Sequence, residues 1–386
     1  MKAEWTINTL GDTCEMYQPK TISSKEMVQD GAYPVFGANG MIGRYDQYNH
    51  EEPQLLITCR GATCGSVNIS EPFSWITGNA MVVRPKQVEL DMRFLEYLFR
   101  GGIDISQAIT GAAQPQITRT NLSPLKISYP TSIIEQQRIV AILDEAFDAI
   151  AAARANAEQN RQNARALFES YLQSVFSQRG EGWVEKSLDD IGTTQTGSTP
   201  KSSEQSSYGD FMPFVKPGDF NSDGSLNYKN DGLSEAGAAN ARKVKAGSAL
   251  MVCIGATIGK AGFCDRIIAT NQQINAFTPN EFVSYKFIYY QMLTGSFKQR
   301  VIHASGQATL PIINKSKWSA LTVAVPPTLD EQHKVVERLD ALRNETQRLE
   351  SLYLRKIAAL DELKQSLLQQ AFSGQLDTTR LEKLPV

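Results

Sequence analysis

The chain has 386 residues, and its 39 lysines and arginines nearly balance its 41 aspartates and glutamates, giving a formal net charge of −2. The hydrophobic fraction of 41%, with 16 Phe and 13 Tyr, excludes a disordered chain, which would combine low hydrophobicity with high net charge. No apolar run reaches the roughly 18 to 20 residues that a membrane span needs, and the N-terminus lacks the apolar core of a signal peptide. We therefore expect a folded, cytoplasmic protein of two to four units with no membrane partner.

Residues 1–132 are predicted to form a first globular module. Apolar runs such as Leu55–Ile57 and Ala80–Val83 predict short strands, and residues 92–99 predict a short helix. Its loops carry side chains that can contact bases or phosphates, although each one alone is more often an ordinary surface residue. These candidates are Asn39, Arg44, Tyr45, Arg60, Gln114, Gln116 and Arg119.

Residues 133–180 are predicted to form a long helix. Pro130 precedes it, and Ser132 with Glu135 three residues later has the spacing of a helix cap. Apolar positions then recur at alternating spacings of four and three, which is the seam of a coiled coil. The predicted seam is Ile139, Leu143, Ala146, Ile150, Ala153, Ala157, Asn160, Ala164, Leu167 and Tyr171.

Residues 181–325 are predicted to form a second module of the same mixed α+β type, with strands such as Ala249–Val252 and Leu321–Val325 and a helix at 285–293. Its framework matches the first module, whereas residues 201–245 do not match. Two modules that recognise different targets would share a constant scaffold and differ in their loops. Ordinary sequence drift after a duplication gives the same pattern. The candidate contacts here are Lys201, Lys216, Asn221, Lys229, Arg242, Lys243, Lys245, Gln272, Gln273, Gln307 and Lys315.

Residues 326–378 are predicted to form a second long helix, followed by a tail at 379–386. Its start repeats the first helix start at an offset of 196 residues, and the same offset carries the predicted seam into this helix. A repeat of this length indicates a duplicated domain rather than a solenoid of short units. We expect the two helices to pair antiparallel, with a pseudo-twofold axis and the modules at opposite ends. Asn160 and Lys356 occupy equivalent polar seam positions, where they would either fix the register or face solvent at a seam irregularity.

The sequence shows no catalytic motif. Residues 255–261 have neither the glycine spacing nor the Ser or Thr of a phosphate-binding loop. His50, His303 and His333 are isolated, so no zinc site is indicated. The five cysteines do not form a disulfide framework, and we expect them to be reduced and mostly buried.

These elements together resemble the specificity subunit of type I restriction-modification systems. The resemblance covers nearly the whole chain. It rests on the helix-start motif Glu-Gln-x-x-(Ile/Val)-Val at Ile133–Val140 and Leu329–Val336, on Gly-Ala-Thr-x-Gly in both modules, and on the elements Gly111–Ile117 and Gly306–Ile313. Residues 30–43 are also similar to a stretch found in such target-recognition domains.

The resemblance implies that each module reads one half of a bipartite, double-stranded DNA target while the helices set the gap between the halves. Because the modules differ in sequence, we expect an asymmetric target. The implied partners are two modification subunits, which use S-adenosylmethionine to methylate adenine, and restriction subunits, which use ATP. The resemblance implies neither a cofactor bound by this chain nor a catalytic role for it.

Two other classes of function stay open at this point. The chain could itself be an enzyme acting on DNA, in which case it would transfer methyl groups without a partner. It could instead be a coiled-coil scaffold that reads no DNA, in which case changing its loop residues would leave its activity intact.

Overall fold

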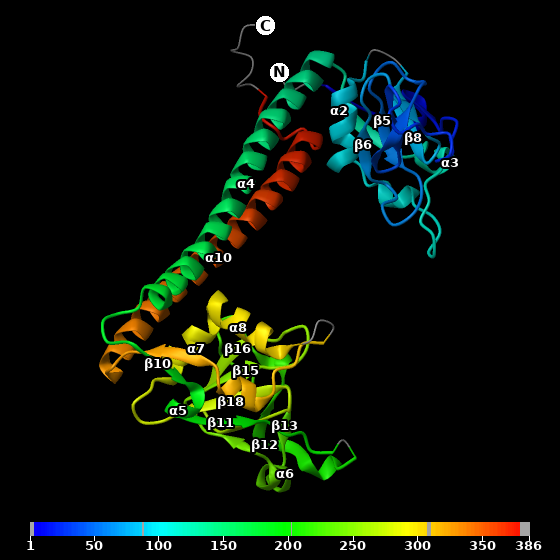
Figure 1. Cartoon of the computed structure of the whole chain (residues 1–386). Helices are drawn as coiled ribbons and strands as arrows, with labels where there is room; N and C mark the ends of the chain where they lie inside the picture. Colours follow the sequence, from blue (N-terminus) through cyan, green and yellow to red (C-terminus); the bar gives the residue numbers. More distant parts are fainter. Residues whose placement is uncertain (1–3, 87–88, 202, 307–309, 379–386) are drawn as a thin grey trace. The chain divides into compact units, whose positions relative to one another are not determined.

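The computed structural model describes residues 4–86, 89–201, 203–306 and 310–378, so the candidate Gln307 and the predicted tail at 379–386 lie outside the described residues. The chain divides into two compact units, Met1–Glu158 with Leu354–Val386, and Gln159–Tyr353. Each unit combines one globular module with part of each long helix (Figure 1).

The first module contains two small sheets and a terminal strand pair. β1 (Trp5–Thr9) pairs antiparallel with β9 (Lys126–Pro130). A four-stranded sheet has the order β2 (Cys14–Tyr17), β8 (Ala80–Pro85), β5 (Leu55–Thr58) and β6 (Val67–Ile69). A three-stranded sheet has the order β4 (Gly40–Tyr45), β3 (Tyr33–Gly37) and β7 (Trp75–Ile76). The helical segments are α1 (Leu10–Thr13), α2 (Met92–Tyr97), a π-helical turn at Leu98–Gly102, a 3₁₀ turn at Ile105–Ala108 and α3 (Arg119–Leu122).

The second module repeats this plan and adds to it. β10 (Val184–Ser187) pairs with β19 (Thr322–Val325), and a four-stranded sheet has the order β11 (Gly192–Thr196), β18 (Ile274–Pro279), β15 (Ser248–Val252) and β16 (Ala261–Cys264). The second sheet has four strands, β13 (Gly232–Leu233), β12 (Tyr208–Val215), β17 (Ile268–Thr270) and β14 (Lys243–Val244). The helices are α5 (Leu188–Ile191), α6 (Glu235–Asn240), α7 (Tyr285–Leu293), α8 (Gly295–Ser305) and α9 (Lys315–Ser319), with 3₁₀ turns at Gln205–Ser207 and Pro217–Asp219.

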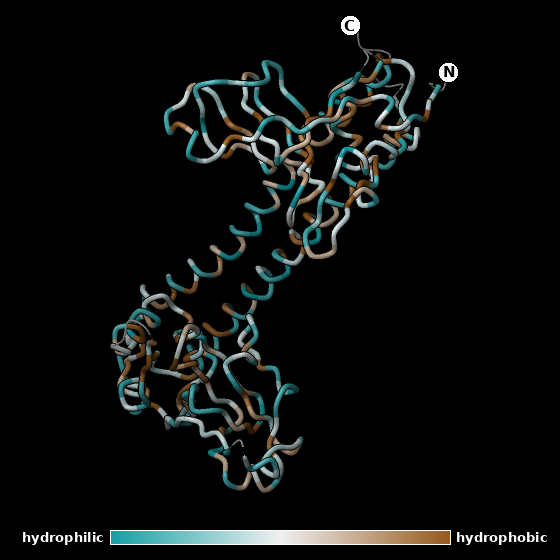
Figure 2. The backbone as a smooth tube through the Cα atoms, turned by 90° about the vertical axis from the view of Figure 1, so that its right-hand side faces the viewer, coloured by the Kyte–Doolittle hydropathy of each residue, from teal (hydrophilic) through white to brown (hydrophobic). Residues whose placement is uncertain are grey.

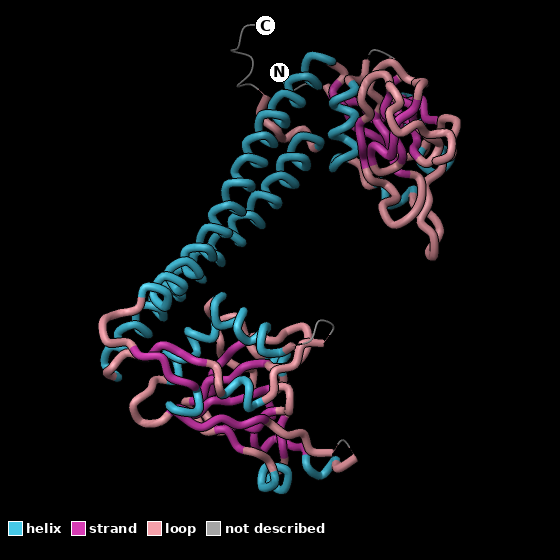
Figure 3. The backbone as a smooth tube through the Cα atoms, in the orientation of Figure 1, coloured by secondary structure: helices cyan, strands magenta, loops and turns pink. Residues whose placement is uncertain are grey.

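The mixed α+β prediction is confirmed, and the strands lie inside each module with loops around them (Figure 3). The central strands β5 and β15 are buried at every position, as expected for continuous apolar runs rather than alternating ones. α2 and α7, both expected from the sequence, contribute buried residues to the main core of their module. These repeated frameworks hold the variable loops.

The two long helices are α4 (Ile133–Gln178) and α10 (Leu329–Phe372), of 46 and 44 residues. They run antiparallel within each unit. In the first unit Lys364 lies over the ring of Phe147 and Arg154 forms an ion pair with Asp361, so rising numbers on α4 meet falling numbers on α10. In the second unit Arg343 lies over Phe168, and Arg165 pairs with Glu350.

The internal repeat relates these contacts in pairs. In each pair, the residue that α4 supplies to one contact is equivalent to the residue that α10 supplies to the other. The offset of 196 residues carries Arg154 to Glu350 and Arg165 to Asp361, so one ion pair becomes the other with its charges reversed. The same offset converts the Phe147–Lys364 contact into the Arg343–Phe168 contact. The helical parts of both units therefore share the predicted pseudo-twofold pattern.

The predicted seam positions Ala164, Tyr171, Leu360 and Leu367 are buried or half-buried, and the predicted seam is unbroken as far as Ala157 and Tyr353. Beyond these residues Asn160 and Lys356 are exposed, and Leu167 and Leu363 are 53% and 47% exposed. Arg161 and Phe168 are less exposed than their neighbours Asn160 and Leu167, and Ile357 is less exposed than its neighbour Lys356. A second spacing of four, from Ala157 to Arg161 and from Tyr353 to Ile357, moves alternate seam positions by one residue, because a straight helix of 3.6 residues per turn drifts from a strict seven-residue repeat. Asn160 and Lys356 therefore mark a seam irregularity, and teal positions interrupt the brown ones along both helices (Figure 2).

A buried glutamine joins each long helix to its module. Gln136, fully buried, accepts a hydrogen bond from the Asp91 backbone N–H and donates to the carbonyls of Glu89 and Pro130. Gln332 accepts from the Ser284 N–H and donates to the Phe282 carbonyl in the same way. The glutamine of the repeated helix-start motif thus fixes how each helix leaves its module.

A carboxylate about two turns further along each helix makes a second repeated contact. Asp144 accepts hydrogen bonds from Tyr97 and Arg93 of α2. Its repeat equivalent, Asp340, accepts from Tyr290 and Lys286 of α7. Each module is therefore attached to its long helix by two sets of polar contacts at matching positions.

Candidate nucleic-acid interface

The repeated Gly-Ala-Thr segment forms a tight turn in each module. In the first module the turn contains Gly61 and Gly65, both with φ near +90°, a region that favours glycine. The Gly61 N–H donates to the Pro115 carbonyl at 3.0 Å, and the Ile117 N–H donates to the Cys59 carbonyl at 2.9 Å. These bonds flank an antiparallel bridge between Arg60 and Gln116. In such a pair the two side chains lie close together on one face.

The second module has the same backbone arrangement. Gly255 and Gly259 also have positive φ, the Gly255 N–H donates to Pro311 at 3.0 Å, and the Ile313 N–H donates to Cys253 at 3.0 Å. The bridge formed here is Ile254 with Ile312. We call these two regions the turn patches: Arg60, Gln114 and Gln116 in the first module, and Ile254, Leu310 and Ile312 at the equivalent positions in the second.

The first module brings several sequence candidates together at its turn patch. Arg60, Gln114 and Gln116 are exposed there. Asn39, in the turn between β3 and β4, accepts hydrogen bonds from Thr58 and Thr63, and Thr63 belongs to the Gly-Ala-Thr turn itself. This part of the module therefore offers several amide and guanidinium groups to solvent.

The other candidates of the first module lie apart from this group or have internal roles. Arg44 donates from Nε to the Gly31 carbonyl at 2.6 Å and from Nη2 to the Ala32 carbonyl at 2.7 Å, so it holds its own loop together. Tyr45 packs edge-on against Trp75 with ring centroids 5.2 Å apart. Arg119 is exposed at the first residue of α3, three residues after Gln116 of the turn patch.

The candidates of the second module fall into two groups. One group surrounds the loop that precedes β18. Gln272 accepts a hydrogen bond from Thr199, and Arg242 donates to the Thr196 carbonyl at 3.1 Å. The Lys243 carbonyl accepts a hydrogen bond from the Gln195 side chain, and Lys245 is exposed nearby in the sequence. The Gln273 carbonyl accepts from the Cys253 N–H, and this bond links the loop to the turn patch. Lys216, paired with Asp231 at 2.8 Å, directly follows Val215, whose carbonyl accepts a hydrogen bond from the Asn271 N–H of this loop.

The second group lies in the loop between β12 and β13. The Asn221 amide donates to Ser225, and the Lys229 N–H donates to Asn227. Arg343 of α10 donates to the carbonyl of neighbouring Ser222, and Tyr289 donates to that of Asp223. This loop is thus held against α7 and α10 of its own unit. Lys201 and Lys315 are exposed, in the loop after β11 and at the start of α9.

Comparison with known proteins decides the family. The model of the family described as type I restriction modification DNA specificity domain matches this chain twice, at residues 2–159 and 180–359. The chain belongs to this family. The two matches correspond to the two repeats, and the recognition made from the sequence is confirmed.

Individual relatives of this chain are type I restriction enzyme specificity subunits. The EcoDI type I restriction enzyme specificity subunit of Escherichia coli is 23% identical over 412 residues, covering 97% of this chain and 89% of that protein. The HindI specificity subunit of Haemophilus influenzae is 33% identical over 149 residues, so the match spans 38% of this chain and about a third (32%) of that subunit.

Solved structures share the fold. A chain described as "Structural basis underlying complex assembly and conformational transition of the type I R-M system" has a TM-score of 0.78 at 17% identity, covering 97% of this chain and all of that one. The HsdS subunit of Thermoanaerobacter tengcongensis has a TM-score of 0.60 at 17% identity, with 96% and 97% covered. At this identity the likeness concerns the architecture alone.

Two features of this chain were not predicted from its sequence. The apolar turn patch was missed because only polar residues were sought as contacts, although the aligned repeats place Ile312 opposite Gln116. An aromatic row in the first module was also missed, in which Tyr48 lies 4.9 Å from Tyr33 and 5.3 Å from Phe73 between ring centroids. Phe73, half exposed, has φ of 50°, which is unusual for a bulky residue. No short motif marks that row.

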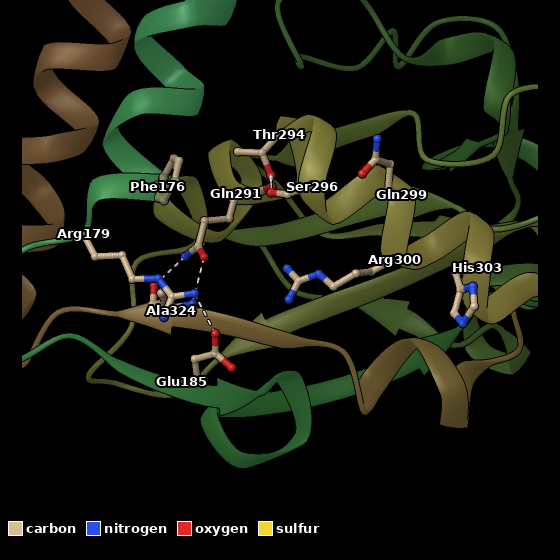
Figure 4. Close-up of a pocket in the computed structure, with 10 residues that line it drawn as sticks. All are labelled: Phe176, Arg179, Glu185, Gln291, Thr294, Ser296, Gln299, Arg300, His303 and Ala324. Carbon is tan, nitrogen blue, oxygen red and sulfur yellow. Dashed lines mark hydrogen bonds and ion pairs between the residues drawn. The ribbon is translucent and has the colours of Figure 1, made fainter.

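A cavity of about 460 Å³ in the second unit contains none of the predicted contacts. It lies beside α8, which supplies Gln299, Arg300 and His303 (Figure 4). Arg179 is paired with Glu185 at 2.6 Å, and Arg300 donates to Thr322 at 3.2 Å. Burial lowers the pKa of Arg300 from its ordinary value, since desolvation disfavours the charged form.

The described residues contain no group of three or more His, Cys, Asp or Glu side chains that could hold a metal, and no described helix is long and apolar enough to cross a membrane. All five cysteines are free thiols, four of them buried. Burial raises the pKa of Cys14 and Cys264 to about 11 and that of Cys253 to about 12. These thiols are therefore poor nucleophiles at neutral pH, because the thiolate is the reactive form.

Proposed function

We propose that this chain is the DNA-recognition subunit of a type I restriction-modification complex, in which each module reads one half of a split, asymmetric target. The observation that carries the proposal is the pair of turn patches. Two modules of one fold hold Arg60, Gln114 and Gln116 in one case and Ile254, Leu310 and Ile312 in the other, on the same backbone bonds. Surfaces of such different chemistry suit two different base sequences.

The contacts of the candidate residues suggest which of them meet DNA. Arg60, Gln114, Gln116, Arg119 and Lys315 are exposed around the turn patches, where arginine suits guanine, glutamine suits adenine and lysine suits phosphate. Arg44 and Asn221 act instead within their own loops, because their donors are occupied by neighbouring backbone or side-chain atoms. The near-neutral net charge implies that phosphate contacts are local or shared with partner subunits.

The long helices act in this proposal as the spacer between the half-sites. Helices of 46 and 44 residues extend for roughly 65 to 70 Å at 1.5 Å per residue, longer than the 34 to 36 Å that separates half-sites one DNA turn apart. The helices pair antiparallel in both units through contacts that the repeat relates, and this supports their role as a spacer of fixed length.

Two modification subunits are the proposed partners, and they would supply the S-adenosylmethionine and the methyl transfer to adenine. The repeat leaves Leu167 on α4 and Leu363 on α10 about half exposed at equivalent positions. An exposed leucine repeated by the pseudo-symmetry suits two copies of the same partner. Restriction subunits that use ATP complete the proposed complex, which acts in the cytoplasm. This chain itself holds no cofactor and performs no catalysis in the proposal.

The test is base-resolved mapping of adenine methylation in cells carrying this chain and its neighbouring methyltransferase, against cells lacking only this chain. We expect a split, asymmetric motif that disappears with the deletion. Unchanged methylation would refute the proposal in favour of a scaffold, and methyl transfer by the purified chain alone would make it an enzyme.

A further inference from the structure

The apolar turn patch of the second module is unusual because its side chains lie outside the core. Leu310 is 54% exposed and Ile312 is 42% exposed, whereas the neighbouring Ile313 is buried in the core. Leu310 lies above the turn, since its Cδ1 would be 3.9 Å from a Cβ placed on Gly255. The hydrogen bonds on either side of the Ile254–Ile312 bridge hold these side chains in place, so the backbone framework itself presents them to solvent.

Three lysines lie near this turn in the sequence or in space. Lys260 ends the same turn, and Lys315 follows Ile313 at the start of α9. Lys298 of α8 reaches the turn from the other side, with its Cγ 3.6 Å from a Cβ placed on Gly259. Among the described residues none of these three lysines forms an ion pair. An exposed apolar group with lysines nearby is complementary to a base methyl group flanked by phosphates.

The first module offers the opposite chemistry at the same backbone position. Its patch consists of Arg60, Gln114 and Gln116, whose groups hydrogen-bond to the edges of guanine and adenine. Its counterpart of Lys315 is Arg119, also exposed at a helix start. The cationic position is thus kept while the centre changes from polar to apolar.

We propose that the Ile254, Leu310 and Ile312 patch contacts the 5-methyl group of thymine in the major groove, and so specifies thymine in the half-site of the second module. This inference rests on the proposed function. It assigns to the two modules two different modes of base recognition, hydrogen bonding in one and methyl contact in the other.

The experiment replaces each thymine of the mapped target, one at a time, by uracil, which lacks only the methyl group. Binding of the complex of this chain with its modification subunits is then measured on each duplex. We expect a loss of about fourfold in affinity for a contacted methyl, in one half-site only. The variant Ile312→Gln, which introduces the side chain of the first module, should abolish this difference between thymine and uracil.

Ile267→Gln is the matched control, because Ile267 is 54% exposed at the far end of β16 from the turn. This variant should keep the full sensitivity to uracil. If no uracil substitution weakens binding, or if Ile312→Gln leaves the sensitivity unchanged, the methyl contact is refuted while a mapped split motif still supports the proposed function. If deletion of the chain does not alter methylation, the proposed function itself fails.

Discussion

At the scale of single residues, the glutamine of the helix-start motif has a structural role in both repeats. Gln136 and Gln332 are 0% and 1% exposed, and their amides bond to backbone groups at matching positions. The sequence marked the motif as repeated but could not show most of its partners, because these lie about 45 to 50 residues upstream. The glutamine thus fixes each module on its helix.

Replacing Gln136 by Ala should destabilise the first unit by about 2 to 4 kcal/mol, because the Asp91 N–H and the carbonyls of Glu89 and Pro130 would lose their partner in a buried place. Urea unfolding followed by tryptophan fluorescence measures this loss. Gln137→Ala, at the exposed neighbouring position, is the control and should change stability by less than about 0.5 kcal/mol. Equal effects of the two variants would contradict the assigned role.

The buried thiols predict a stability that falls in alkaline solution. The pKa of Cys14, Cys253 and Cys264 is raised by burial from 9.0 to about 11 or 12 in the folded chain. Above pH 9 the unfolded chain therefore loses thiol protons that the folded chain keeps, and the free energy of unfolding decreases towards pH 11. Urea unfolding between pH 7 and pH 10.5 measures the slope, which should be smaller in Cys253→Ala. A slope unchanged by that substitution would contradict the prediction.

At the scale of elements, the positions of the long helices were predicted well, but the residues that each helix buries in its seam were predicted less well. Pro130 and the capping residues predict a start that the structure places at Ile133, and the apolar spacing predicts the first half of the seam. The phase after Ala157 could not be predicted, because a seven-residue repeat and a 3.6-residue helix diverge slowly and the sequence pattern tolerates both. Loop residues such as Arg44 were harder still, since their hydrogen bonds depend on the path of a distant backbone segment.

The shifted seam makes a prediction about paired substitutions on α4. Ala164→Gln should destabilise the chain by about 1 to 3 kcal/mol, because Ala164 is 5% exposed and the larger side chain must displace its neighbours. Asn160→Gln should have almost no effect, because that position is exposed. Thermal unfolding of both variants tests this, because a strict repeat places both positions in the seam and would give Asn160→Gln an effect comparable with that of Ala164→Gln.

At the scale of the whole molecule, the internal duplication was evident from the sequence because the helix-start motif returns at a constant offset. The contacts add that the duplication is conserved in its packing, with Arg154–Asp361 and Arg165–Glu350 as equivalent pairs of opposite polarity. The different chemistry of the two turn patches became visible only when the bridges at Arg60 and Ile254 were compared. One backbone framework therefore carries two surfaces of different chemistry.

The central claim is that two modules read two half-sites at a distance set by the helices, and lengthening both helices tests it most directly. Seven helix-forming residues would be inserted after Gln159 and after its repeat equivalent, Arg355, so that the antiparallel pairing is kept. The added length of about 10 Å corresponds to about three base pairs of DNA. Base-resolved methylation mapping should then show both half-sites unchanged and the gap between them about three base pairs wider. Methylation that persists with the original gap would contradict the spacer role of the helices.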